Sequence, residues 1–160
     1  MAILNIVKDG DEILRKKCRP VKEINPHIIR LLDDMKATLR KANGVGLAAP
    51  QVGVLRRIAI VECEEGELIE LINPEIISSE GEQEEIEGCL SVPGRWGITH
   101  RPMKVKVRAT DRNGDSFEVE GEGLLARALC HEIDHLDGVI FYDKAVRMLT
   151  KEEIEGDDEQ

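Results

Sequence analysis

The first amphipathic segment of the chain follows Asn25. Asn before Pro26 is typical of a helix start, because Asn caps free N–H groups and Pro fits the first helical position. Beyond this pair, apolar residues recur every three or four positions at Ile28, Ile29, Leu32, Met35 and Leu39. The spacing predicts an amphipathic helix that extends to the turn at Asn43-Gly44.

Short β-like runs follow, separated by Gly, Pro or acidic clusters. They are Arg57–Cys63, Leu68–Ile72, which ends at Asn73-Pro74, and Ile76-Ile77. Further on, the segments 104–109 and 116–120 both alternate apolar and polar positions, with Asn113-Gly114 between them. This pattern predicts a β-hairpin.

A second helix is predicted from near Gly123 to Gly138, since glycine is common just after a helix end. Its apolar residues spread around most of the circumference, at Leu124, Leu125, Ala126, Ala128, Leu129, Ile133 and Leu136. Such a helix should be buried. Its last two turns nevertheless carry four polar side chains, His131, Glu132, Asp134 and His135. Burying charged groups costs on the order of several kcal/mol each unless they are paired or bind a metal.

These elements predict an α+β fold in a single domain over residues 1–160. The helix with the two histidines should be central, with small antiparallel β-sheets around it and the N-terminal helix packed outside. With 160 residues, 41% of them apolar, the chain can bury one core. The acidic end, about residues 151–160, should be a helix end that frays into a solvated tail.

Charge and composition limit the classes of partner. The formal net charge of −10, with one Trp, one Tyr and two Phe, argues against DNA or RNA, which proteins bind through clustered cations and stacked rings. No apolar run approaches the roughly 20 residues that cross a bilayer, and the start has no signal-peptide pattern. We therefore expect a cytoplasmic protein that binds neither DNA nor membranes. Its four cysteines, without close spacing, are expected to stay reduced.

His131-Glu132-Ile133-Asp134-His135 is an HExxH motif on the second predicted helix. His131 and His135 lie about 40° apart around the helix and one turn apart along it, so both imidazoles can bind one ion. Glu132 is offset from both, which places its carboxylate beside the ion, where it can accept a proton from bound water. Asp134 points away from the metal face, and we interpret it as structural, with Arg101 as a candidate partner.

A third ligand is needed, because a catalytic ion takes three protein ligands and keeps one open position. Downstream, the chain offers only Asp137, Asp143 and the acidic end. Upstream, Cys89 lies in a short apolar segment flanked by Gly and Ser. Cys130 is the competing thiol, but on a helix it would point about 100° away from His131, so we interpret it as core packing.

Three segments resemble the signature motifs of peptide deformylases, in the order and spacing of that family. They are Gly44-Val45-Gly46-Leu47-Ala48-Ala49-Pro50-Gln51, Glu87-Gly88-Cys89-Leu90-Ser91 and His131-Glu132-Ile133-Asp134-His135-Leu136-Asp137-Gly138. The resemblance extends from the N-terminal segment to about Asp143. Two departures are visible: Cys130 stands where the family usually has Gln, and Gly94-Arg95-Trp96 follows Pro93 in a stretch that varies among members.

The resemblance implies a metal-dependent hydrolase that removes the N-formyl group from the formyl-methionine of newly synthesised polypeptides and releases formate. The implied catalytic set is Cys89, His131 and His135 as ligands, Glu132 as base and then acid, and the Gln51 amide and Leu90 N–H as oxyanion donors. The implied substrate-binding set is Gly46, through its backbone, and Val45, Ile86, Leu124 and Ala128, with His131, around the methionine side chain.

The resemblance also implies ferrous iron as the physiological ion, with Zn²⁺, Ni²⁺ or Co²⁺ able to replace it. Its implied partners are N-formyl-methionyl nascent peptides, met in transient proximity to the ribosome. The HExxH motif leaves two alternatives. One is a zinc peptidase, which needs a downstream ligand and usually a larger chain, and the other is a non-catalytic structural module, which needs four ligands.

Overall fold

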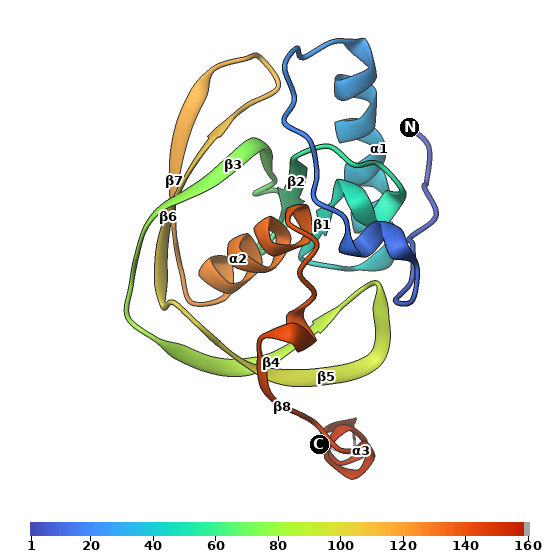
Figure 1. Ribbon diagram of the computed structural model, residues 1–160, viewed down its shortest axis with the longest axis vertical. Helices are drawn as coiled ribbons and strands as arrows, with labels where there is room; N and C mark the ends of the chain where they lie inside the picture. The colour runs from blue at the N-terminus through green and yellow to red at the C-terminus, as the bar shows by residue number, and fades with distance from the viewer. Residues whose placement is uncertain (159–160) are drawn as a thin grey trace.

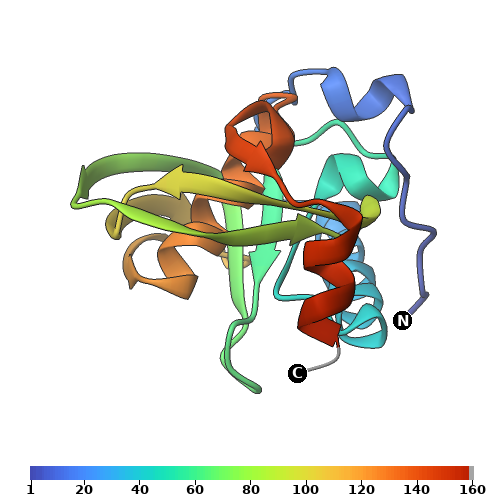
Figure 2. The same cartoon turned by 90° about the horizontal axis from the view of Figure 1, so that it is seen from below.

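The computed structural model describes residues 1–158, and its helix α2 (Leu124–Leu136) lies at the centre with strands around it (Figure 1). The larger antiparallel sheet has the strand order β1-β2-β3-β6-β7, formed by Gly46–Ala48, Ile58–Val61, Ile69–Glu80, Lys104–Thr110 and Ser116–Glu122. The smaller has the order β4-β5-β8, formed by Gln83–Cys89, Val92–Arg101 and Ala145–Met148. Seen from below, β4 and β5 cross in front of α2 (Figure 2). The predicted α+β class is confirmed.

Helix α1 spans Pro26–Ala42 and starts and ends where the pattern predicts. The Asn25 side chain accepts a hydrogen bond from the Ile28 N–H at 3.1 Å, which caps the first turn. Asn43 ends the helix in a left-handed conformation, with φ 56°. The apolar face of α1 is buried against β1 and β2 through Leu32, Met35 and Leu39.

Strand β2 explains why α1 and α2 lie on opposite faces of the larger sheet. Ile58 and Ile60 belong to the buried cluster that contains the α1 face, whereas Ala59 and Val61 belong to the cluster that contains α2. Successive side chains of a strand point to opposite faces, so a strand covered on both sides is apolar at every position.

Strand β3 corrects one prediction. The expected break at Asn73-Pro74 is wrong, because a single strand runs through both residues. The register with β6 shifts between Ile72 and Glu75, so Pro74, which has no N–H to donate, lies in a β-bulge. Asn73 has φ 52°, and its side-chain amide makes two 2.8 Å hydrogen bonds with the backbone of Val21.

The β6-β7 hairpin is confirmed, with its turn at Asn113-Gly114. The β4-β5 hairpin was not predicted. Strand β4 lies at an edge of the smaller sheet and carries Glu84, Glu85 and Glu87, so no alternating apolar pattern marks it. Cys89, the predicted third metal ligand, pairs with Val92 at the tight end of this hairpin.

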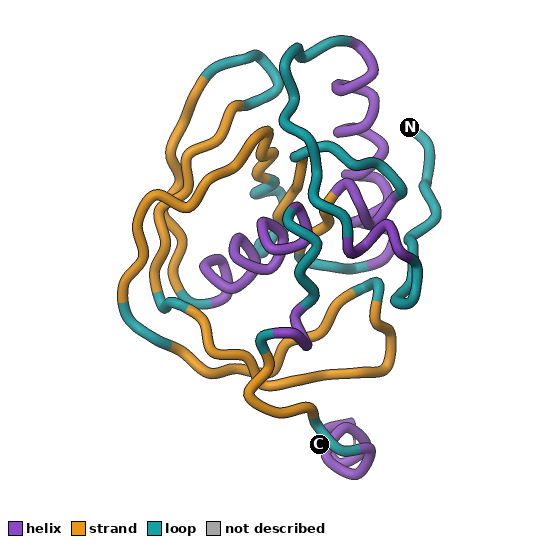
Figure 3. The backbone as a smooth tube through the Cα atoms, in the orientation of Figure 1, coloured by secondary structure: helices purple, strands orange, loops and turns teal. Residues whose placement is uncertain are grey.

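Apart from the 3₁₀ turn η1 (Glu12–Arg15), residues 1–25 form loops (Figure 3). This segment hydrogen-bonds to both upstream motifs: the Val7 N–H donates to Gln51 O and the Asp9 N–H to Ser91 O, each at 2.7 Å. Two further 3₁₀ turns are η2 (Ala49–Val52) and η3 (Phe141–Asp143). The acidic end forms α3 (Lys151–Asp158) beyond β8, and positions 159–160 of the predicted tail lie outside the described residues. Within those residues, no helix is both long and apolar enough to span a membrane.

Candidate functional site

The three predicted metal ligands converge between α2 and the smaller sheet. The Sγ of Cys89 and one ring nitrogen each of His131 and His135 all lie within 4.8 Å of one another. The Cys89 Sγ is 3.3 Å from Nε2 of His135. The histidines come from successive turns of α2 and the thiol from the end of β4, so the group exists only where helix and hairpin meet.

Cys130 lies outside this group. It is buried in the cluster between α2 and the larger sheet, which also contains Cys18 and Ala48. Burial raises the pKa of the Cys130 thiol. The interpretation of Cys130 as core packing is therefore confirmed.

A buried charge network orients His131. Its Nδ1 lies 2.6 Å from Glu87 Oε2, and because an ionised carboxylate only accepts, Nδ1 donates and leaves Nε2 available for a metal. Arg101 donates to both oxygens of Glu87, at 2.8 and 2.7 Å, and to Asp134 at 2.9 Å. Burial opposes ionisation of Glu87, but hydrogen bonds from Arg101 and His131 hold its pKa below the usual range. The predicted Asp134–Arg101 contact is confirmed, whereas sequence reasoning missed the role of Glu87, for which membership of the second motif was the only signal.

Glu132 lies beside the ligands and is 3% exposed. Its Oε1 has no hydrogen-bond partner within the part of the chain that the structure describes. Burial raises the pKa of Glu132 to about 7, and the carboxylate of Glu87 adds to the rise while His131 opposes it. A Cβ added to Gly46 would overlap this carboxylate, so only glycine lets β1 lie so close to Glu132. Sequence reasoning did not anticipate this second reason for a glycine at position 46.

Gln51 is fixed with its amide nitrogen toward the ligands. Its Oε1 accepts from the Ala48 N–H at 2.9 Å, and its Nε2 donates to Ser91 Oγ at 3.1 Å. The same nitrogen is 3.5 Å from the Cys89 Sγ. Leu90 follows Cys89 directly in the chain, so its backbone also adjoins the metal group.

A cavity of about 460 Å³ joins these residues. Every residue predicted for catalysis or substrate binding contributes to its wall, as do two of the ligands: Val45, Gly46, Gln51, Ile86, Cys89, Leu90, Leu124, Ala128, His131 and Glu132. Four apolar side chains of this wall, Val45, Ile86, Trp96 and Leu124, are 41%, 46%, 42% and 44% exposed and form its mouth. The structure thus brings the predicted residues to one place.

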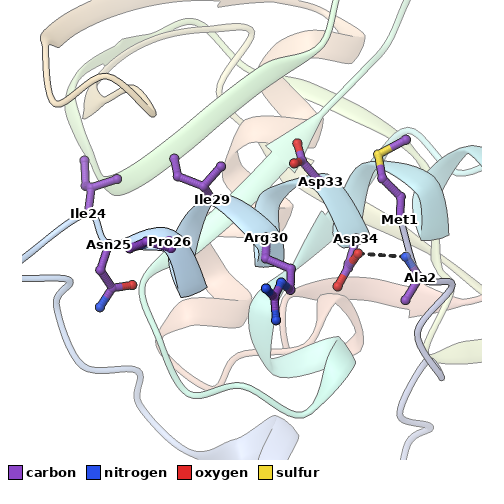
Figure 4. Close-up of a pocket in the computed structure, with 9 residues that line it drawn as sticks. All are labelled: Met1, Ala2, Ile24, Asn25, Pro26, Ile29, Arg30, Asp33 and Asp34. Atoms are coloured by element: carbon purple, nitrogen blue, oxygen red, sulfur yellow. Dashed lines mark hydrogen bonds between the residues drawn. The ribbon is translucent and has the colours of Figure 1, made fainter.

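A larger hollow, of about 680 Å³, lies between the first two residues and the start of α1 (Figure 4). Its polar groups are those of Asn25, Arg30, Asp33 and Asp34, and the Ala2 N–H donates to Asp34 at 2.8 Å. No His or Cys lines it, and none of the predicted site residues lies there. Volume alone does not mark the functional site.

Comparisons with known proteins show the family of this chain. The family model described as polypeptide deformylase matches residues 3–151. The chain belongs to the peptide deformylase family. The peptide deformylase of Caldanaerobacter subterraneus subsp. tengcongensis is 61% identical over 98% of each chain, and that of Thermoanaerobacter pseudethanolicus is 60% identical over 97% of each.

Solved peptide deformylase structures have the same fold. The enzyme from Legionella pneumophila aligns with a TM-score of 0.87 and 44% identity, over 97% of this chain and 92% of that one. The enzyme from Thermotoga maritima aligns with a TM-score of 0.87 and 35% identity, over 91% of this chain and 99% of that one. Membership of the peptide deformylase family makes this chain an enzyme, a hydrolase of the deformylase type. Neither the zinc peptidase nor the non-catalytic structural module is supported.

Proposed function

We propose that this peptide deformylase removes the formyl group from the N-terminal formyl-methionine of newly synthesised polypeptides and releases formate. One observation carries the proposal. A thiol and two imidazoles converge within 4.8 Å beside the buried, unpartnered carboxylate oxygen of Glu132, in the wall of a cavity with an apolar mouth.

In this proposal Cys89, His131 and His135 hold one divalent ion. The donor set fits such an ion, since His131 Nδ1 is already engaged by Glu87 and the remaining donors face one another. Thiolate with imidazole suits Fe²⁺, which we propose as the physiological ion, and also Zn²⁺, Ni²⁺ or Co²⁺ as substitutes. An ion held by these three residues would supply Lewis-acid chemistry, which activates the formyl carbonyl and makes the attacking water more acidic.

The side chains around the ligands perform the proton and charge transfers. Glu132 accepts a proton from the attacking water and delivers it to the departing amine. A C–O bond forms at the formyl carbon, the C–N bond breaks, and formate and a free amine result. The Gln51 amide and the Leu90 N–H donate to the oxyanion that develops on the formyl oxygen.

The cavity wall would receive the first residue of the substrate. The methionine side chain is surrounded by Val45, Ile86, Leu124 and Ala128, with His131. The Gly46 backbone binds the extended peptide. We propose that N-formyl-methionyl nascent peptides are met in the cytoplasm, in transient proximity to the ribosome. The net charge of −10 argues against direct DNA binding, and we propose no membrane partner.

The test supplies metal-loaded protein with formyl-Met-Ala, acetyl-Met-Ala and an unformylated peptide, and measures free amine and formate. We expect release from formyl-Met-Ala alone, loss of release with a chelator, and recovery with Fe²⁺. Cleavage of internal peptide bonds, or no release from the formyl substrate, would overturn the proposal.

A further inference from the structure

One charged side chain of the cavity wall has no place in the reaction described above. One face of α2 lines the cavity with four residues at spacings of three and four: Leu124, Arg127, Ala128 and His131. Three of them belong to the predicted site. Arg127 adds a guanidinium to the part of the wall that is proposed to hold an apolar side chain.

A buried amide holds Arg127 in place. Its Nη1 donates to Gln83 Oε1 at 2.8 Å, and Gln83 Nε2 donates to Pro102 O at 2.9 Å and to Gly123 O at 3.0 Å. Gln83 is 8% exposed, and these three bonds fix which end of its amide faces Arg127. The guanidinium is therefore oriented by the core.

Arg127 differs from the other guanidinium of the cavity. Arg95 lies 3.7 Å from Asp9 and stacks over the Tyr142 ring at 5.1 Å, so an acid and an aromatic face already engage it. Among residues 1–156, whose side chains the structure describes, no carboxylate lies within ion-pair distance of Arg127, and Gln83 is its single side-chain partner. A guanidinium has five N–H donors, and the bond to Gln83 engages one of those of Arg127.

The other N–H groups of Arg127 can donate to a ligand that carries an acceptor. At 1.5 Å per residue, the Cα atoms of Arg127 and His131 are about 6 Å apart along the axis of α2, a distance comparable to an extended methionine side chain. The methionine thioether is a weak acceptor. Its oxidised form, the sulfoxide, presents a strongly polar oxygen at the same place along the side chain.

We propose that Arg127 is a specificity-determining residue that lets this enzyme deformylate peptides beginning with N-formyl-methionine sulfoxide. The proposal rests on the proposed function, because the first residue of the substrate must enter this cavity. The guanidinium donates to the sulfoxide oxygen, and Gln83 is the positioning residue that holds it there. The bonds formed and broken at the formyl group are unchanged, so no oxidant or reductant takes part.

The test measures kcat/KM of the metal-loaded enzyme for formyl-Met-Ala and for its sulfoxide counterpart, and compares their ratio between variants. Arg127→Leu should lower the ratio of kcat/KM for the sulfoxide to kcat/KM for the methionine peptide about tenfold. This is the effect expected from the loss of one charge-assisted hydrogen bond. Arg127→Lys should restore part of it, since it keeps the charge. Arg108→Leu removes an equal charge from the exposed face of β6 and should leave the ratio unchanged.

Binding gives a second measurement. In a Glu132→Ala background, calorimetric affinities for the two formyl peptides should show the same dependence on Arg127. An unchanged ratio in Arg127→Leu, equal loss for both substrates, or no activity of the parent enzyme on the sulfoxide would each overturn the inference. Failure of the parent enzyme on formyl-Met-Ala would instead contradict the proposed function.

Discussion

At the inner end of the cavity, Glu132 and His131 are 3% and 8% exposed, whereas Leu124 and Ile86 at its mouth are 44% and 46% exposed. The inner side chains are also tied to one another. His131 is held by Glu87, Glu87 by Arg101, and the Gln51 amide by Ser91. Within the described part of the chain, no such bonds hold the apolar side chains of the mouth.

The two ends should therefore respond differently to substitution. A hydrogen-bonded, buried group has one geometry, and its removal leaves partners unsatisfied, so effects on rate and metal affinity are large. An exposed apolar side chain contributes through contact area, at about 25 cal/mol per Å², so its loss costs little and mainly affects substrate binding. Substitutions at the two ends can test this contrast.

The largest effect is expected for Glu132→Ala. It removes the group that transfers protons, so kcat for formyl-Met-Ala should fall by about 10² to 10⁴. Metal content, measured by elemental analysis, should stay near one ion per chain, because Glu132 lies beside the ligands. Glu118→Ala, at an exposed position of β7, is the control. If the metal were lost together with activity, Glu132 would be a ligand.

Cys89→Ser should come next, with activity and metal affinity both reduced more than about a hundredfold. Cys130→Ser is the matched control in the same enzyme. It places a hydroxyl in the core and costs about 1–3 kcal/mol of stability, but it should keep most activity below its unfolding temperature. Chelator competition and steady-state rates measure both. Equal loss in the two variants would contradict the assignment of Cys89.

How far the sequence could predict the site depends on the range of each interaction. His131 and His135 were predictable because helical spacing is local and fixes their relative direction. The Asn25 cap and the Asn113-Gly114 turn were predictable for the same reason. Cys89 could be proposed from the residues as a ligand candidate, since the chain offers few alternatives.

The rest depends on contacts between distant segments. Arg101 was a candidate partner of Asp134, but it also meets Glu87 across 14 positions, and no local pattern encodes that pair. The need for glycine at position 46, beside Glu132, depends on how closely β1 approaches α2. The residues around the mouth were assigned from the family resemblance, because an exposed apolar side chain has no distinctive spacing of its own.

The orienting network gives a third, smaller effect. Glu87→Gln keeps the size of the side chain but removes the charge that holds His131 and Arg101. We expect metal affinity to fall about 10- to 100-fold, with activity recovered in excess metal. Glu118→Gln is the control, because Glu118 pairs with Arg108 in solvent. An unchanged metal dissociation constant would mean that the backbone of α2 alone positions His131.

The smallest effect is expected at the mouth. Leu124→Ala removes apolar contact from the proposed methionine slot, worth about 1–2 kcal/mol, so KM for formyl-Met-Ala should rise about 5- to 30-fold with kcat nearly constant. Formyl-Ala-Ala, whose first side chain is too short to reach Leu124, should show almost no change. Val146→Ala, at an exposed apolar position on β8 outside the cavity, controls for surface effects. A fall in kcat comparable to that of Glu132→Ala would mean that the mouth shapes the inner end, and that the two regions do not act separately.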